Sequence, residues 1–330
     1  MKSSMALVRE FNDLLGIDTL LVLTDRSKVI SKLREQKQTA IVVDYGEKMV
    51  EATTKDRNTF LFNPTINSNQ VDQNMMKYNP LSEVRLKTRF EYDDVCQIAE
   101  VIMSGQEIQN VIVREIARDL LIMVILHLCY VSDFYNKKRP NICDIENHLF
   151  RTNMNIADAI DSWGKCIHIS KDEFLSDKNI FEQVYGEYID GLSQIKQNLK
   201  IIQAEDKIKP FLTHPQIKSI SRILLNFPDY RCSEALLVIK RCLEPYCNSK
   251  VIRNMDESNF EMDDIVSSNK GKTVYLIVEP WETKNSLPVI KMFLEQAIKR
   301  HKMMKSSREN LLLVFNSGDI KDDINEFVCI

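Results

Sequence analysis

The chain has 330 residues, of which 44% are hydrophobic and 28% charged, and a formal net charge of −3 at pH 7. This length favours about two domains, and the near-neutral charge excludes electrostatic attraction of the whole chain to nucleic acid or anionic lipid. The eight cysteines include no C-x-x-C pair, which favours free thiols in a reducing compartment and predicts no metal site.

The first part of the chain has the pattern of an α/β domain. Leu20–Thr24 and Ala40–Asp44 are continuous apolar runs, as expected of strands covered on both faces, and Thr59–Phe62 is a third candidate strand. A strand, a turn, a helix and a second strand ending in Asp is how a nucleotide-binding domain begins. The amide-rich stretch Asn63–Asn79 is predicted to be a loop.

From about Ser82 to Pro245 the apolar spacing becomes helical. The longest apolar run, Leu120–Val131, is too short for the about 20 residues of a membrane span, so a buried helix is expected there. His127 in this run is interpreted as a core residue. The predicted helices are Asp94–Met103, Val111–Val131, Asn141–Phe150, Asn155–Cys166, Lys178–Lys200, Pro215–Asn226 and Cys232–Glu244.

After Pro245 the α/β pattern returns. Thr273–Val278 is predicted to be a strand, Pro288–His301 a helix that begins at its proline, and Leu311–Phe315 a buried strand. The expected organisation is therefore an α/β domain made of residues 1–81 and 246–330, interrupted by an all-α domain of residues 82–245.

Four stretches, in this order, are similar to motifs of one known family. They are Ala40–Glu47 (AIVVDYGE), the pair Phe62–Pro64 (FNP) and Tyr78–Leu81 (YNPL), Asp94–Ile102 (DVCQIAEVI) and Thr273–Pro280 (TVYLIVEP). Together they resemble the coupling proteins of type IV secretion and conjugation systems, the TraG/TraD group. These are membrane-anchored hexameric ATPases that bring DNA or protein substrates to the secretion channel.

The resemblance implies a RecA-like P-loop NTPase-type sheet domain, here incomplete, that is interrupted by an all-α domain. It implies secretion components or an intact coupling-protein paralogue as partners, and a cytoplasmic chain held at the inner membrane through them. The sequence shows no transmembrane pair before the first strand and stops soon after Leu311–Phe315. A truncated relative is therefore expected.

The phosphate-binding loop of the family has no intact counterpart. Such a loop has the pattern G-x-x-x-x-G-K-[S/T], because glycines let backbone N–H groups surround the phosphates and the Lys reaches their oxygens. At the matching place the chain reads Leu23–Lys28 (LTDRSK). Ser27 and Lys28 are interpreted as vestigial nucleotide-binding residues, and Asp25 would place a carboxylate beside the phosphate.

The acidic motif is altered as well. In the family a buried strand ends in Asp-Glu, one residue for Mg²⁺ and one to activate water. Here the strand ends in Asn316-Ser317, and an amide carries no charge to bind Mg²⁺. Asn316 and the strand-end carboxylate Asp44 are grouped with Ser27 and Lys28 as vestigial. We therefore expect no cofactor and no catalytic residue; ATP and Mg²⁺ are expected only if hydrolysis has been kept.

Two basic clusters are the candidates for DNA contact, although the ordinary interpretation of each is a solvated loop or helix end. The first is Lys137, Lys138 and Arg139, and the second includes Lys299 and Arg300. The carboxylate pairs Asp93-Asp94 and Asp263-Asp264 are interpreted as helix starts, where they meet the positive end of the helix dipole.

Three functions remain open on the sequence. The first is a coupling-protein-like component that binds a secretion component or substrate without hydrolysing ATP. The second is a working ATPase of DNA or protein translocation, with an atypical phosphate loop that an oligomer completes. The third is a gene remnant without a biochemical role.

Overall fold

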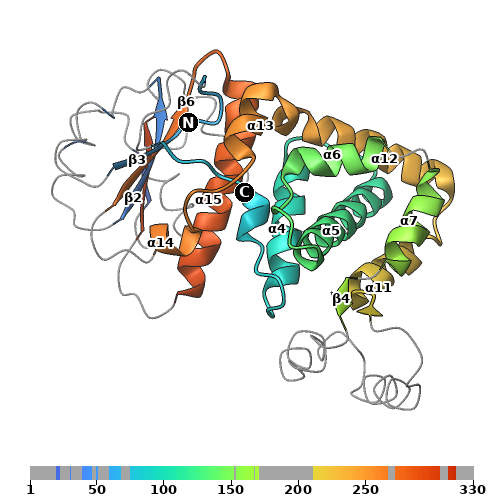
Figure 1. Ribbon diagram of the computed structural model, residues 1–330. Coiled ribbons are helices and arrows are strands. Elements are labelled where there is room, and N and C mark those ends of the chain that lie inside the picture. Colours follow the sequence, from blue (N-terminus) through green and yellow to red (C-terminus); the bar gives the residue numbers. More distant parts are fainter. Residues whose placement is uncertain are drawn as a thin grey trace. The chain divides into compact units, whose positions relative to one another are not determined.

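The computed structural model describes residues 20–22, 30, 39–46, 50, 59–67, 75–151, 154–166, 168–170, 211–266, 272–304 and 311–316. The chain divides into two compact units (Figure 1). Unit 1 consists of Met1–Pro80 and Pro245–Ile330, and unit 2 of Leu81–Glu244. The boundaries expected from the sequence lie one residue from these.

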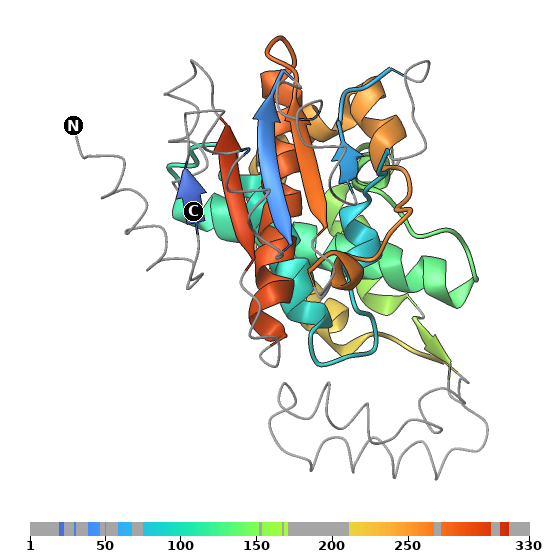
Figure 2. The ribbon, with the colours of Figure 1, turned by 90° about the vertical axis from the view of Figure 1, so that its left-hand side faces the viewer.

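Unit 1 contains a five-stranded sheet in the order β1-β7-β2-β6-β3, in which every neighbouring pair is parallel (Figure 2). The strands are β1 (Leu20–Val22), β2 (Ala40–Tyr45), β3 (Thr59–Phe62), β6 (Thr273–Val278) and β7 (Leu312–Asn316). All five lie where the apolar runs predicted strands. The order shows that strands from both ends of the chain alternate within one sheet.

Alternating residues of the strands form the two cores of unit 1. On one face, Val42, Tyr275 and Val314 belong to a buried cluster against which Ile30 and Val50 pack. The other face is covered by α15 (Thr283–Met303), which lies behind the sheet in Figure 2. The rings of Phe62 in β3 and Phe293 in α15 stack there at 5.9 Å.

Helix α15 begins five residues before the predicted start, so the expectation that Pro288 opens it is wrong. The backbone carbonyl of Glu282 accepts hydrogen bonds from the N–H groups of Asn285 and Ser286, at 3.0 and 2.9 Å. This first turn forms ahead of the proline and places Pro288 inside the helix. The other helices of unit 1 are α13 (Ser249–Met255) and α14 (Met262–Val266).

Unit 2 is helical, and α5 (Val111–Phe134) is its central helix (Figure 1). The side chain of Asn110 caps α5 by accepting from the N–H groups of Ile112 and Val113. The helices packed around it are α4 (Glu91–Ser104), α6 (Ile142–Phe150), α11 (Pro215–Leu224) and α12 (Asp229–Leu243). Helix α7 (Ile156–Lys165) packs on α11 and α12.

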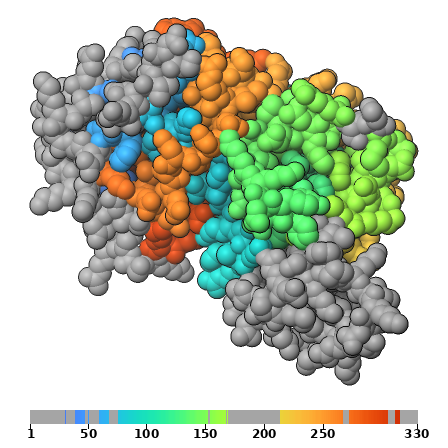
Figure 3. Space-filling view, in the orientation of Figure 1, coloured from blue at the N-terminus to red at the C-terminus, as the bar shows by residue number. Residues whose placement is uncertain are grey.

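These helices agree with the predicted ones except for Lys178–Lys200, which lies outside the described residues. A short antiparallel ribbon joins β4 (Ile169–Ser170) to β5 (Phe211–Leu212). The 3₁₀ turns η2 (Pro80–Glu83) and η3 (Glu244–Cys247) fall at the two unit boundaries. Figure 3 shows the surface of α6 and α7 in green and lime. No helix in the described part of the chain is both long and apolar enough to cross a membrane.

Candidate functional site

The carboxyl edge of the unit 1 sheet is the candidate site, because ligands of open α/β sheets bind outside the carboxyl ends of the strands. The connection from β2 to β3 passes over β6, and the connection from β6 to β7 passes over β2 in the opposite direction. Right-handed crossovers then lie on opposite faces, and the exits of β2 and β6 diverge. Gly46 follows β2 at φ 75° and donates its N–H to the Val278 carbonyl, at 3.0 Å.

Asp44 lies at this edge between two neighbouring strands. Its Cα partners are Ile277 in β6 and Asn316, the last residue of β7. The side chain of Asp44 is fully buried, on the face that carries Val42. The structure thus brings together Asp44 and Asn316, two of the four residues interpreted as vestigial. Ser27 and Lys28 lie outside the described residues, as does Ser317.

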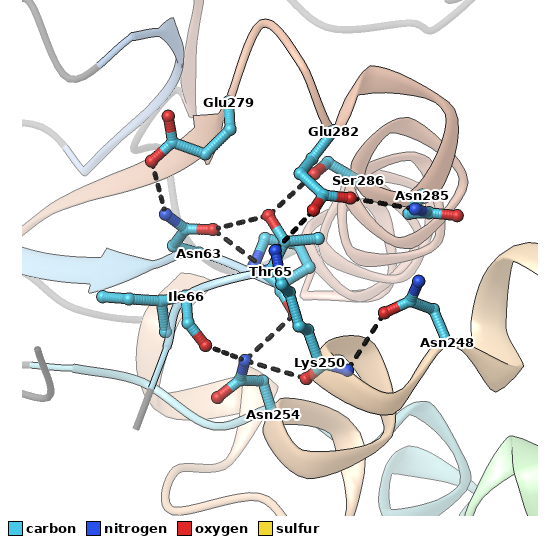
Figure 4. Close-up of polar contacts among 11 residues, drawn as sticks. Asn63, Thr65, Ile66, Asn248, Lys250, Asn254, Glu279, Glu282, Asn285 and Ser286 are labelled. Atoms are coloured by element: carbon cyan, nitrogen blue, oxygen red, sulfur yellow. Dashed lines mark hydrogen bonds and ion pairs between the residues drawn. The ribbon is translucent and has the colours of Figure 1, made fainter. Parts of the chain in front are cut away.

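The Asn-Pro motif after β3 forms a turn, residues 63–66, that is fixed to the exit of β6 (Figure 4). Asn63 is 2% exposed. Its Oδ1 accepts from the backbone N–H of Thr65 at 3.0 Å and from Thr65 Oγ1 at 3.2 Å. Its Nδ2 donates to Oε1 of Glu279, the residue after β6, at 3.2 Å. The amide side chain therefore ties the ends of two adjacent strands together.

The same turn is held by α13 from below (Figure 4). Asn254 Nδ2 donates to the carbonyl oxygens of Pro64 and Ile66, at 3.0 and 3.3 Å. Next to it, Lys250 Nζ donates to Oε1 of Glu282 at 2.6 Å. This hydrogen bond is the main cause that holds the pKa of Glu282 below its ordinary value. The contacts fix the geometry of the strand ends.

The two basic clusters differ in exposure. Lys137 and Lys138 are exposed after α5, whereas Arg139 is half-buried beside the Cys129 thiol. In unit 1, Lys299 is half-buried and Arg300 is 7% exposed, with Nη1 at 3.5 Å from Oδ1 of Asp263. Of the five candidates for DNA contact, only Lys137 and Lys138 in unit 2 are therefore exposed.

The carboxylate pairs lie in the first turns of α4 and α14, as predicted. Asp94 also forms a two-point ion pair with Arg85, whose Nε and Nη2 donate at 2.8 and 2.7 Å. A third acid in the first turn of α4, Glu91, is buried. Its Oε2 accepts from Tyr130 Oη at 2.6 Å and its Oε1 lies 2.9 Å from His214 Nε2.

A histidine–cysteine cluster in unit 2 was missed by the sequence analysis. His127 Nδ1 in α5 lies 2.9 Å from Nε2 of His168, and the Cys166 Sγ lies within 4.8 Å of both ligand atoms. Burial lowers the pKa of both histidines to about 3. The local signal was the C-x-H spacing of Cys166 and His168; its third member is on a helix 41 residues away from His168.

Comparisons with known proteins find similarity to proteins of conjugative transfer. The family described as type IV secretory system conjugative DNA transfer matches residues 26–157. The chain is 21% identical over 225 residues to the conjugal transfer protein TraG of Escherichia coli, a match that covers 67% of this chain and 29% of TraG. The chain therefore spans less than a third of that relative.

The fold is similar to that of a solved bacterial conjugative coupling protein, TrwBdeltaN70. The TM-score is 0.51 at 13% identity, and the match covers 89% of this chain and 54% of that one. This likeness confirms the expected α/β sheet domain interrupted by an all-α domain. On these findings the chain is similar in sequence and in fold to coupling proteins of type IV conjugative systems.

Proposed function

We propose that this chain works in conjugative transfer as a coupling-protein-like component that binds a secretion component, or an intact coupling protein, without hydrolysing ATP. The observation that carries the proposal is the chemistry at the ends of β7 and β2. β7 ends in Asn316, whose Cα partner is the buried Asp44. A hydrolytic site needs an acidic pair there, to hold Mg²⁺ and to activate water.

The sequence after β1 supports the same conclusion. Residues 23–28 (LTDRSK) contain no glycine, so the left-handed backbone of a phosphate nest carries a steric cost at each position. The Asp25 carboxylate adds charge repulsion toward a phosphate. The changes at the two strand ends affect different parts of the reaction, phosphate binding and metal binding.

The surface of unit 2 supports a binding role. Apolar side chains are exposed on α11, on α12 and in the loop between them: Ile223, Leu225, Tyr230 and Leu237. Leu237 is 61% exposed in the middle of α12. These exposed apolar groups on neighbouring elements are the candidates for contact with a partner protein.

The nucleotide part of the proposal is tested by titrating the full chain with a fluorescent ATP analogue and Mg²⁺, and by following phosphate release. We expect neither saturable binding at micromolar concentrations nor turnover by the chain alone, and no turnover above that of the coupling protein when the chain is mixed with an intact one. Turnover that disappears in Lys28→Ala, while the melting temperature is unchanged, would instead support an ATPase completed in an oligomer.

The partner part is tested with the surface of α12. Binding of the labelled chain to an intact coupling protein of the same conjugative system is measured by fluorescence anisotropy. Leu237→Glu is expected to weaken this binding at least about tenfold, because it places a charge in an apolar contact. The matched control is Met154→Glu, an exposed apolar residue outside α11 and α12. Equal affinity of both variants and the wild type would exclude α12 as the contact.

A further inference from the structure

Unit 2 gathers most of the chain's histidines around one buried point. The chain contains five histidines. The ring of His127 in α5 lies near three other aromatic rings. The centroid-to-centroid distances are 5.2 Å to His168, 5.1 Å to His148 of α6 and 6.2 Å to Trp163 of α7. The backbone N–H of His214 lies 3.3 Å from His168 Nδ1. Only His301 belongs to unit 1.

Three of the side chains offer the donor atoms that a transition metal selects. The Nδ1 or Nε2 atoms of His127 and His168 and the Sγ of Cys166 all lie within 4.8 Å of one another. Tetrahedral Zn²⁺, with Zn–N near 2.1 Å and Zn–S near 2.3 Å, requires ligand atoms about 3.4–3.6 Å apart. The observed N···N distance of 2.9 Å therefore has to open by about half an ångström, which is within the reach of side-chain rotation.

We propose that His127, Cys166 and His168 form a binding site for a transition metal, with Zn²⁺ as the preferred ion. Two imidazoles and one thiolate are a donor set that suits Zn²⁺, whereas Mg²⁺ and Ca²⁺ prefer oxygen ligands. The cluster is buried, with His127 5% and His168 2% exposed, so a bound metal would be shielded from water.

The ligand atoms require one change of tautomer. In the metal-free arrangement His168 Nδ1 accepts from the backbone N–H of His214, so Nε2 carries the proton shared with His127. Binding through Nε2 would move the proton to Nδ1, which would then lose the hydrogen bond from the His214 N–H and become a donor. His168 also has a backbone hydrogen bond with Cys166, and a backbone carbonyl is a usual acceptor for the second ring N–H of a metal-binding imidazole.

His148 is the candidate for the fourth ligand. Its Nε2 is buried and has no hydrogen-bond partner within the described residues. Its ring lies 4.9 Å from Trp163 and 5.1 Å from His127. A buried nitrogen without a partner is costly, and a rotation toward the metal would remove that cost. We assign His148 as the fourth ligand of a closed, structural site.

The site would join two parts of unit 2 that no helix connects. His127 is on the central helix α5, and Cys166 and His168 immediately precede β4 of the ribbon. The ribbon strands β4 and β5 flank residues 171–210 in the sequence. A bound metal would fasten the base of this ribbon to the core of unit 2, and so stabilise the unit by the free energy of binding.

The experiment uses the full chain with its affinity tag removed, stripped with a chelator and dialysed. Zn²⁺ binding is measured by competition with a chromophoric chelator, and Co²⁺ is added as a spectroscopic probe. We expect one metal per chain and a near-ultraviolet thiolate-to-cobalt charge-transfer band. Co²⁺ should also quench the fluorescence of Trp163, in a Trp281→Phe background that leaves it as the sole tryptophan.

Variants assign the ligands. Cys166→Ser should abolish the thiolate band and weaken Zn²⁺ at least about a hundredfold, and His168→Ala and His148→Ala should weaken it at least about tenfold. His301→Ala, which removes the histidine of unit 1, should bind like the wild type. Circular dichroism and the urea midpoint check that each variant is folded. Absence of stoichiometric metal in the wild type, or a thiolate band that persists in Cys166→Ser, would overturn the site.

Discussion

Gly164, in the last turn of α7, tests the packing of unit 2 with a change of one methyl group. A Cβ added at this position would lie 2.5 Å from Ser221 Cβ, and closer still to Ser221 Oγ. Ser221 is buried in α11, the helix that packs against α7. On helix propensity alone, Gly164→Ala should stabilise the protein by up to about 1 kcal/mol. The contact with Ser221 predicts instead that Gly164→Ala destabilises the protein.

The size of the effect follows from the distance. Carbon atoms in contact are separated by about 3.5–4.0 Å, so α7 and α11 must separate by about 1 Å to accept the methyl group. Such insertions into a packed interior cost about 1–3 kcal/mol. The overlap is severe, so the cost should lie in the upper part of this range, about 2–3 kcal/mol; with about 1 kcal/mol returned by propensity, the expected net loss of unfolding free energy is about 1–2 kcal/mol.

Urea unfolding in a Trp281→Phe background, followed by the fluorescence of Trp163, the neighbour of Gly164, measures this loss in unit 2. A loss of this size corresponds to a midpoint lower by roughly 0.5–1 M urea. The double variant Gly164→Ala with Ser221→Gly removes the opposing Cβ and should recover most of the loss. A midpoint in Gly164→Ala equal to or above that of the wild type would refute the reasoning.

Three further predictions concern other sites. Asn63→Ala removes three hydrogen bonds of the turn after β3 and should destabilise unit 1 by about 2 kcal/mol. This loss would be measured as faster amide hydrogen exchange in β3, and unchanged exchange would contradict the role given to this side chain. Burial raises the pKa of Cys129 to about 12 and that of Cys242 to about 11, so both thiols should resist iodoacetamide at pH 8 until urea is added, as read by mass spectrometry; native labelling would contradict their burial. Burial lowers the pKa of His127 and His168 from 6.5 to about 3, so the unfolded chain binds these protons more readily. Without metal, the unfolding free energy of unit 2 should therefore be highest above pH 6.5. It should fall as the pH is lowered toward 3, by up to about 1.4 kcal/mol per pH unit for each histidine. A urea midpoint that does not change between pH 7.5 and pH 5 would contradict this.

The strands of unit 1 could be predicted because each is a short continuous run of apolar, mostly aliphatic, β-branched or aromatic residues, which is typical of strands in a parallel sheet. Their order could not. β2 pairs with β6 and β7, which lie more than two hundred residues further along the chain, and no local pattern records which distant strand is the neighbour. The start of α15 was misplaced for a related reason, since a proline is a good first helical residue and the carbonyl of Glu282 begins the turn earlier.

The site was predictable only in part. Asp44 and Asn316 stand at strand ends in the sequence, and parallel pairing brings them side by side. The role of Asn63 depends on Glu279, a partner 216 residues away, so an amide-rich stretch indicated only a loop. Likewise the C-x-H spacing of Cys166 and His168 gained meaning only when the packing of unit 2 placed His127 beside them.

The division of unit 1 into two chain segments has a consequence for the order of folding. β6 is translated only after the whole of unit 2, so the pairing of β2 with β6 must close a loop of roughly 230 residues if unit 2 is still unfolded. If unit 2 is folded first, the flexible part of that loop shrinks by nearly two doublings, and the entropic cost falls by about 1 kcal/mol. If unit 2 folds first during synthesis, it therefore favours the pairing of β2 with β6. A substitution that slows the folding of unit 2 would then delay formation of the sheet, although it contacts none of the strands.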